Sequence, residues 1–302
     1  MYVQKLDTFG GHREGVYALE PAKGAGSFFS AGGDGLIVRW QLSRPDLGDL
    51  IARVSASVYA LAYDPARNWL WVAQNYQGIH RIDPDLKETQ GSLRLTSAAI
   101  YALKLYRNQL FVALGDGVVI VVDAGELAVR KHLKASDKSA RSIAINPVSG
   151  EFAVAYSDHM IRIFDLETLN LKQVLTGHAN SVFTVAYSPD GRYLLSGSRD
   201  AHLKVWSVTD GYSVKEDIVA HMFSINHIVF SPDGTLFATA SMDKSIKIWN
   251  AATFKLLKVV DRARHAGHGT SVNRLLWETD QHHLLSASDD RTISVWSVKL
   301  SQ

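Results

Sequence analysis

The sequence predicts an all-β fold built from one structural unit repeated seven times, and three observations lead to this prediction. At four places along the chain a His is followed 22 residues later by an Asp and 6 residues after that by a Trp. Short apolar segments and tight turns recur with the same period between these places. Alternating patterns dominate the units, and helical periodicity is almost absent. A spacing repeated every 40 to 47 residues is typical of repeat architectures, in which each unit buries its apolar face against its neighbours.

The clearest element of each unit is a hairpin, made of a short apolar strand, a tight turn and an alternating strand that ends in an aromatic or aliphatic residue. Four copies keep both the Asp and the Trp, at residues 28–40, 194–206, 236–249 and 283–296. Three weaker copies lie between the first and the second of these, at residues 70–83, 110–123 and 152–165. The seven turn positions are Asp34, Tyr76, Asp116, Asp158, Asp200, Asp243 and Asp290.

Two further strands complete each unit. One precedes the hairpin, as at residues 57–65 and 181–189, and the other links neighbouring units, as at 171–178 and 255–261. Four short antiparallel strands in each of seven units predict a seven-bladed β-propeller. The chain ends in the third strand of the last unit, so we expect residues 2–9 to supply its fourth strand and to remove the unpaired edges of an open ring. Because the repeat runs from end to end, we predict that residues 1–302 form a single domain.

The composition argues against several classes of protein. The chain is 46% apolar and 21% charged, which is typical of a compact globular protein. The formal charge is +2 with basic and acidic residues intermixed, so nucleic-acid binding is unsupported. There is no Cys, which excludes disulfides and thiolate chemistry. We expect a cytoplasmic protein, because the sequence shows neither a signal-peptide core nor an apolar run that could span a membrane.

Each of the four intact units also has a hydroxyl residue four positions before its Asp. The four sets are His12, Ser30, Asp34 and Trp40; His178, Ser196, Asp200 and Trp206; His221, Thr239, Asp243 and Trp249; and His268, Ser286, Asp290 and Trp296. When buried, the Asp can accept a hydrogen bond from the His, the other ring nitrogen can reach the hydroxyl, and the hydroxyl can accept from the indole N–H. We interpret these sets as structural tetrads and not as catalytic triads, because they recur in four units and no Ser lies in a Gly-x-Ser-x-Gly turn. No catalytic residue is therefore predicted.

The other His residues do not form a recognisable metal site. His265 and His268 are three residues apart, and His282 and His283 are adjacent. No carboxylate or Cys stands at a ligand spacing from them, so we predict neither a metal nor a cofactor. The stretch 261–269 lengthens the last repeat, and we expect it to be a solvated insertion between units.

The Gly-His and Trp positions resemble the WD-repeat (tryptophan-aspartate repeat) β-propeller family over essentially the whole chain. Gly-His pairs occur at residues 11–12, 177–178 and 267–268, whereas Ala220 precedes His221. The Asp of the namesake dipeptide is absent after the four Trp residues and is present after the weaker hairpins, at Asp83, Asp123 and Asp165. The resemblance implies a non-enzymatic interaction scaffold.

The resemblance also implies that a partner binds at the face near the entrance of the central channel. The implied contact positions lie three and five residues after the His and directly before the turn Asp. From these positions we predict a partner-binding set that consists of Tyr17, Tyr59, Tyr101, Arg141, Phe183, Arg199, Asn226, Met242, Asn273 and Asp289. Tyr and Arg are frequent in the energetically dominant parts of interfaces. Arg141 and Arg199 belong to neighbouring units, so together they would hold a carboxylate or a phosphate of a peptide.

We therefore expect a protein or peptide partner of unknown identity on a propeller that is monomeric by itself and can serve as a subunit of a larger complex. One alternative is a small-ligand-binding or enzymatic propeller with its site at the channel mouth. The predicted inward positions contain Asp289 as their only carboxylate, which argues against chemistry there. A third possibility is that the outer strands of the rim pair with a partner. The sequence does not choose between the face and the rim.

Overall fold

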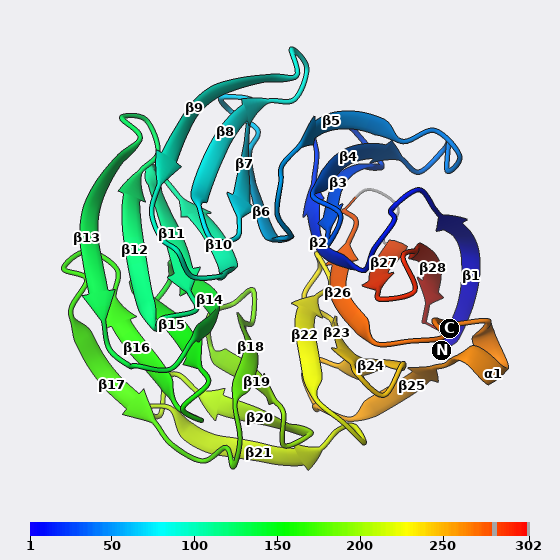
Figure 1. The fold of residues 1–302 in the computed structure, drawn as a ribbon. Coiled ribbons are helices and arrows are strands. Elements are labelled where there is room, and N and C mark those ends of the chain that lie inside the picture. Colours follow the sequence, from blue (N-terminus) through cyan, green and yellow to red (C-terminus); the bar gives the residue numbers. More distant parts are fainter. Residues whose placement is uncertain (280–282, 301–302) are drawn as a thin grey trace.

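The structure of the protein is a computed structural model that describes residues 1–279 and 283–300. It has seven four-stranded antiparallel sheets, which are arranged as blades around a ring (Figure 1). This arrangement confirms the predicted seven-bladed β-propeller. Each blade is built from chain neighbours in sequence order, except for the blade that closes the ring.

The strands fall into four concentric positions within the blades (Figure 1). The innermost strands are β2 (Val16–Pro21), β6 (Val58–Asp64), β10 (Ile100–Tyr106), β14 (Ala140–Asn146), β18 (Val182–Tyr187), β22 (Ile225–Phe230) and β26 (Val272–Trp277). The second strands are β3 (Ser27–Gly32), β7 (Trp69–Gln74), β11 (Gln109–Leu114), β15 (Glu151–Tyr156), β19 (Tyr193–Ser198), β23 (Leu236–Ser241) and β27 (His283–Ser288). The third strands are β4 (Leu36–Gln41), β8 (Gly78–Asp83), β12 (Val118–Asp123), β16 (Ile161–Asp165), β20 (His202–Ser207), β24 (Ile246–Asn250) and β28 (Ile293–Lys299). The outermost strands are β5 (Asp49–Arg53), β9 (Glu88–Arg94), β13 (Ala128–Lys134), β17 (Leu171–Leu175), β21 (Ser213–Val219), β25 (Leu256–Val260) and β1 (Tyr2–Phe9).

The N-terminal strand closes the ring as predicted. β1 pairs antiparallel with β28, from Tyr2 opposite Lys299 to Phe9 opposite Ile293, and completes the sheet β1-β28-β27-β26. The two ends of the chain therefore lie side by side (Figure 1). Val3 and Phe9 of this strand are buried, so the closure also contributes to the apolar core.

The core lies between neighbouring blades, since each blade packs its apolar face on the next. Blades are numbered by their innermost strands, from β2 in the first to β26 in the seventh. Phe111 of the third blade and Phe152 of the fourth have ring centres 4.9 Å apart and belong to one apolar cluster. The second and third strands are largely buried, whereas outer strands such as β21 are mostly exposed to solvent. β-branched and aromatic side chains fit this pleated, two-sided burial.

The stretch 261–269 lies between β25 and β26 and exposes residues 262–264 and 266, in agreement with the solvated insertion predicted from the sequence. It contains a single helical turn, α1 (Arg262–His265), whose N-terminus is capped by Asp261 through a 2.9 Å hydrogen bond from the Arg264 N–H. The Nζ of Lys5 donates to the Ala266 carbonyl at 3.0 Å and joins the turn to β1. A short polar residue before a helical turn is a favourable cap, which explains the local order.

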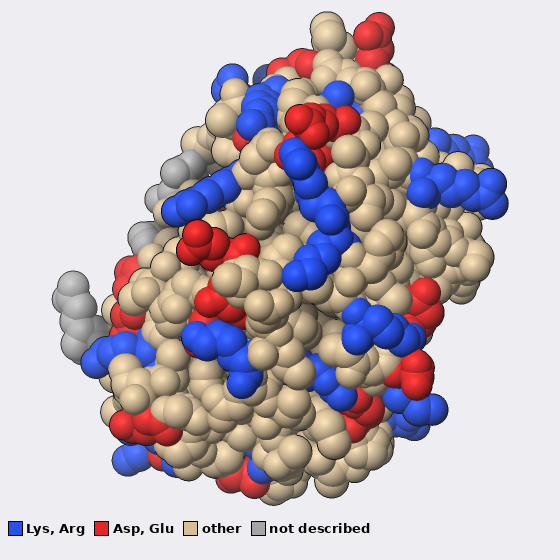
Figure 2. Space-filling model, turned by 90° about the vertical axis from the view of Figure 1, so that its left-hand side faces the viewer, with Lys and Arg blue, Asp and Glu red and all other residues tan. Residues whose placement is uncertain are grey.

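Charges of both signs are intermixed on one side of the disc. Figure 2 shows Lys and Arg beside Asp and Glu on the side of the molecule that carries β13 and β17, without a field of one sign. Within the described parts of the chain, no helix is long and apolar enough to cross a membrane.

Candidate functional site

The four predicted tetrads lie inside their blades as continuous hydrogen-bonded chains. The His Nδ1 to Asp carboxylate distances are 3.1 Å for His12, 3.0 Å for His178, 2.9 Å for His221 and 2.8 Å for His268. The His Nε2 lies 2.7 to 2.8 Å from the hydroxyl of Ser30, Ser196, Thr239 or Ser286. The indole N–H of Trp40, Trp206, Trp249 or Trp296 donates to the same hydroxyl at 2.7 to 3.0 Å.

The environment of the tetrads supports a structural role. All four hydroxyl residues are 0% exposed, so a substrate has no access to the atom that would act as a nucleophile. Each Asp also accepts backbone N–H groups of the two loops that it joins, as Asp200 does from Ala179 and His202, both at 2.9 Å. Burial by itself would raise the pKa of the Asp200 carboxyl. The hydrogen bonds from His178 and from the backbone outweigh burial, so this pKa lies well below its usual range. The ionised Asp therefore ties two loops of the same face together.

The weaker blades use other polar contacts at the equivalent turns. In the fourth blade, Ser136 occupies the His position and its hydroxyl donates to Asp158 at 2.6 Å, while Arg162 pairs with the same carboxylate at 2.8 Å. In the second blade, Tyr76 occupies the Asp position with φ 65°, a left-handed conformation that is uncommon for an aromatic residue. In the other six blades the left-handed residue is the one after the Asp position, as at Ala201 with φ 67°, so the hairpin is kept in all seven blades whereas its turn conformation differs in the second.

Every innermost strand carries a β-bulge near its start, and this bulge shapes the channel entrance. In β2, Val16 pairs with Gly32 and Ala18 with Ala31, which leaves Tyr17 as the extra residue. The residues at this position in the seven blades are Tyr17, Tyr59, Tyr101, Arg141, Phe183, Asn226 and Asn273. They are the residues five after the His position. Because a bulge interrupts the alternation of a strand, it can turn two consecutive side chains toward the same space.

A pocket of about 500 Å³ occupies the channel entrance, and nine of the ten predicted partner-binding residues line it. On one side the rings form an arc. Tyr17 and Tyr59 have ring centres 5.1 Å apart in an edge contact, and Tyr59 stacks on Tyr101 at 5.8 Å. The guanidinium of Arg141 continues the arc between Tyr101, at 3.9 Å, and Phe183, at 4.7 Å.

The opposite wall is polar and is tied across the blades. The Asn226 amide donates to Ser271 and to the Val272 carbonyl, both at 2.9 Å. The Asn273 amide donates to the Val16 carbonyl at 3.1 Å and to Asp289 at 2.8 Å. These bonds hold the sixth, seventh and first blades together and fix the position of the Asp289 carboxylate. The pocket therefore has an aromatic wall and an amide wall.

Arg199 is the exception among the predicted partner-binding residues. It lies in the β19–β20 turn on the same face, is exposed and does not line the pocket. Arg141 is instead held between two rings of its own arc. The predicted pairing of Arg141 with Arg199 is therefore not formed, because the bulge places Arg141 in the channel entrance whereas the turn places Arg199 in solvent.

Two charged or titratable residues of the pocket were not predicted. His227 and Arg274 follow the bulge residues of the sixth and seventh blades and line the same pocket. The residues at this position are Ala18, Ala60, Ala102, Ser142, Thr184, His227 and Arg274. Five of these residues are small, and the last two, His227 and Arg274, are large and polar. This contrast is visible in the sequence and distinguishes the two residues.

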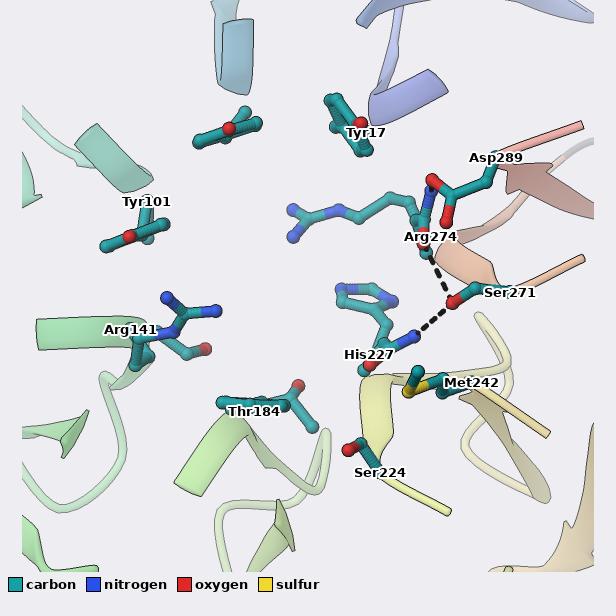
Figure 3. A pocket seen from close by; sticks show the side chains of 16 residues that line it. Tyr17, Tyr101, Arg141, Thr184, Ser224, His227, Met242, Ser271, Arg274 and Asp289 are labelled. Atoms are coloured by element: carbon teal, nitrogen blue, oxygen red, sulfur yellow. Dashed lines mark hydrogen bonds between the residues drawn. The ribbon is translucent and has the colours of Figure 1, made fainter. Parts of the chain in front are cut away.

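The electrostatic character of the pocket is set by its titratable side chains. Figure 3 shows the guanidinium groups of Arg141 and Arg274 extending into one space, with the His227 ring beside Arg274. Burial lowers the pKa of both Arg141 and Arg274, while both groups remain cations at neutral pH. Burial, with Arg274 and Lys104 nearby, holds the pKa of His227 well below its usual range, so this ring is neutral. Asp289 is the carboxylate of the lining.

A second pair of charges lies deeper in the channel. Glu20 and Lys104 line a cavity of about 380 Å³ at its other end. Burial raises the pKa of Glu20 and lowers that of Lys104. Lys104 remains exposed to solvent within the ring, which screens the effect of burial on it. The opposite charges of the two groups cancel, so they do not alter the net charge of the channel.

The His residues considered as metal ligands are placed elsewhere. His268 belongs to a tetrad, His265 lies in α1, and His282 falls outside the described residues. Residues 1–279 and 283–300 contain no group of three His, Asp or Glu side chains that could hold a metal ion.

Comparison with known proteins gives matches to one family. Residues 169–207, 213–250 and 260–297 match the WD40 family, described as "WD domain, G-beta repeat". These segments cover the tetrads of the fifth, sixth and seventh blades.

Three curated relatives illustrate the similarity. WD repeat-containing protein SL1-17 of Schistosoma mansoni is 26% identical over 206 residues, which cover 68% of this chain and 55% of that protein. Striatin-3 of Mus musculus is 26% identical over 253 residues, which cover 71% of this chain and 30% of that protein. The CCR4-associated factor 4 homolog of Candida glabrata is 34% identical over 108 residues, which cover 35% of this chain and 18% of that protein. The chain thus spans about half or less of the length of these relatives. The three matched repeats, the similarity to WD repeat-containing proteins and the seven four-stranded blades together support a WD-repeat β-propeller family for this chain.

Proposed function

We propose that the protein is a non-enzymatic interaction scaffold that binds a protein or peptide partner on its channel-entrance face. The observation that carries this proposal is the pocket of about 500 Å³ in which an aromatic arc, an Arg and an amide wall come together. Large, rigid aromatic side chains and Arg dominate the energetics of protein interfaces. The rings and Arg141 are half-buried, so each still offers surface to a partner.

An apolar patch borders the pocket on the sixth blade. It consists of Met222, Phe223 and Met242, which are 82%, 56% and 55% exposed. Their loops are adjacent, since the Met242 N–H donates to the Ser224 carbonyl at 3.0 Å and the Met222 N–H donates to Asp243 at 3.1 Å. Exposed apolar side chains beside a pocket usually mark an interaction site. This blade-six patch would extend the contact with a partner beyond the pocket.

The names of the relatives are consistent with such a role. The Candida glabrata protein is named as a factor associated with CCR4, and a similar Arabidopsis thaliana protein is named as a transcriptional corepressor. The partner of this chain is not given by these names. The cytoplasmic location of the protein, its organisation as a single domain and its membership of a larger complex stay predictions.

An affinity capture from native lysate tests the proposal. The immobilised wild type is compared with a Phe223→Ser/Met242→Ser variant, and retained proteins are identified by mass spectrometry. We expect a partner that the wild type retains and the variant loses, because the variant removes apolar contact area beside the pocket.

A control uses apolar residues on the opposite face that are at least as exposed. Val148 and Leu86 are 74% and 64% exposed and lie in the loops after β14 and β8, at the other ends of the blades. A Val148→Ser/Leu86→Ser variant should keep the partner. Retention by the entrance-face variant, with loss in the control, would place the interface elsewhere and overturn the proposal.

A second candidate function rests on the volume of the same pocket. About 500 Å³ lies within the range of small-molecule sites. If neither variant nor wild type retains a protein, thermal-shift measurements with a metabolite collection would test this small-ligand function directly.

A further inference from the structure

We propose that the entrance pocket recognises one carboxylate of an acidic side chain, Asp or Glu, in the partner segment, and that Arg141 and Arg274 hold it. This inference rests on the proposed function and names the chemistry that the pocket selects. It differs from the pairing predicted from the sequence, since Arg274 takes the place of Arg199.

The first observation is that Arg274 has unused hydrogen-bonding capacity inside the pocket. Its Nε is buried and has no hydrogen-bond partner, and no carboxylate of the described residues forms an ion pair with its guanidinium. Glu20 acts on it only through charge at a distance. A buried donor without a partner is costly in the free protein, and a planar carboxylate is the group that satisfies a guanidinium with two parallel hydrogen bonds.

The second observation is that Arg141 is preorganised. Its guanidinium carbon lies 3.9 Å from the ring centre of Tyr101 and 4.7 Å from that of Phe183, and the guanidinium also hydrogen-bonds to Tyr101. The side chain is thus held in place, while an Arg has five N–H donors, so further ones remain for a ligand in the pocket (Figure 3). A ligand therefore does not have to immobilise this side chain, which reduces the entropic cost of binding.

The third observation is the charge balance, which favours a carboxylate over a phosphate. The lining contains two cations, Arg141 and Arg274, and one carboxylate, Asp289, which leaves one positive charge because His227 is neutral. A single carboxylate neutralises this charge. A phosphate monoester carries about −1.5 to −2 at neutral pH, and its excess charge would be repelled by Asp289, whose position Asn273 fixes at 2.8 Å.

The surroundings favour an acidic residue within a peptide. The aromatic arc and the blade-six patch flank the two Arg residues, so neighbouring residues of the same segment would find apolar contacts. A small free carboxylate ion would bind the two Arg residues but would lack these apolar contacts.

The test uses positional-scanning libraries of fluorescein-labelled, C-terminally amidated hexapeptides, so that only side chains supply a carboxylate. Sub-libraries carry Glu, Asp, Gln, phosphoserine or Lys at one fixed position, and binding to the full chain is followed by fluorescence anisotropy. We expect the Glu or Asp sub-library to bind at least about tenfold more tightly than the Gln one, the ratio expected for a charge-assisted hydrogen bond. Phosphoserine should not exceed Glu.

The variants separate Arg274, which should matter, from Arg199, which should not. Arg274→Met should abolish the preference for Glu over Gln, and Arg274→Lys should keep part of it. Arg199→Met is the matched control on the same face and should keep all of it. Thermal unfolding verifies that each variant is folded, and Arg274→Gln replaces Arg274→Met if the latter is not.

The outcomes distinguish this inference from the proposed function. Equal binding of the Glu and Gln sub-libraries, or a preference that survives Arg274→Met, would overturn the carboxylate site and leave peptide binding intact. Tighter binding of phosphoserine than of Glu would overturn the choice of a carboxylate. Absence of binding by every sub-library would overturn the proposed function and this inference with it.

Discussion

The guanidinium carbon of Arg141 lies 3.9 Å from the centre of the Tyr101 ring and 4.7 Å from the centre of the Phe183 ring. Two blades thus clamp a charge that belongs to the blade between them. Cation–π contacts of this kind are stronger when they are partly desolvated. The clamp explains how a cation is kept at the channel entrance without an ion pair, and it makes Arg141 a fixed feature of the binding surface.

Arg274→Met should stabilise the unliganded protein. The substitution removes a partly buried cation that forms no ion pair within residues 1–279 and 283–300 and lies in the same pocket as Arg141. We expect the free energy of unfolding to rise by about 1 kcal/mol, since an apolar side chain of similar length avoids the desolvation cost. Urea unfolding checks this, with Arg199→Met as the control that should change stability by less than about 0.5 kcal/mol. A marked loss of stability would mean that Arg274 has a structural role.

Asp200→Ala should destabilise the fold by about 2 kcal/mol, because it leaves the buried His178 and the N–H groups of Ala179 and His202 without their acceptor. Asp116→Ala is the matched control. Asp116 holds the same turn position but is exposed, and its side chain accepts from the Val118 N–H alone among the described residues. Equal effects of the two substitutions in urea unfolding would argue against the tetrad as a source of stability.

Removal of residues 1–9 should lower the melting temperature by more than about 10 °C, since the deletion exposes the edge of β28 and removes Phe9 from the core. Phe9→Ala alone should cost about 3 to 5 kcal/mol. Leu6→Ala, at a 46% exposed position of the same strand, should have little effect. Differential scanning calorimetry measures all three, and an unchanged transition after the deletion would show that β1 does not stabilise the ring.

Stability should fall on mild acidification because of His227. Burial and the positive charges of Arg274 and Lys104 hold its pKa well below 6.5 in the folded state, so below that pH the unfolded chain binds a proton that the folded chain does not. The contribution of the neutral His227 to the free energy of unfolding is therefore present above pH 6.5 and is lost as the pH falls below that value. Between pH 7.5 and 5.5, the wild type should lose about 1 kcal/mol more than His227→Gln. A His132→Gln control at an exposed position should behave as the wild type, and parallel curves for all three proteins would contradict the prediction.

Several features could be predicted because they depend on local patterns. The unit count and the hairpin positions follow from the spacing of the Asp turns, and the closing strand follows from the third-strand position of residues 293–296 at the end of the last unit. The weaker second blade was found by the same spacing, although Tyr76 adopts φ 65° where most blades have an Asp. Alternation and turn spacing are properties of the chain itself, so they survive the loss of individual signature residues.

The details of the site depended on the register between strands. Strict alternation would have placed Asn273 and Arg274 on opposite sides of β26, yet both line the pocket because a bulge separates Val272 from Arg274 in the ladder. A bulge is decided by pairing with the neighbouring strand, and the residues of one strand do not reveal it. The same holds for α1, whose cap and contact with Lys5 join segments from opposite ends of the chain.

The sequence by itself therefore determined the seven blades and the tetrads as candidates for a buried network, and its resemblance to the WD-repeat family implied the residues at the channel entrance. Only the tertiary structure decided that Arg141 shares the pocket with Arg274 and not with Arg199. The physical reason is that periodicity specifies which residues are equivalent between blades, whereas the closure of the ring and the bulges in its innermost strands specify which side chains meet across the channel.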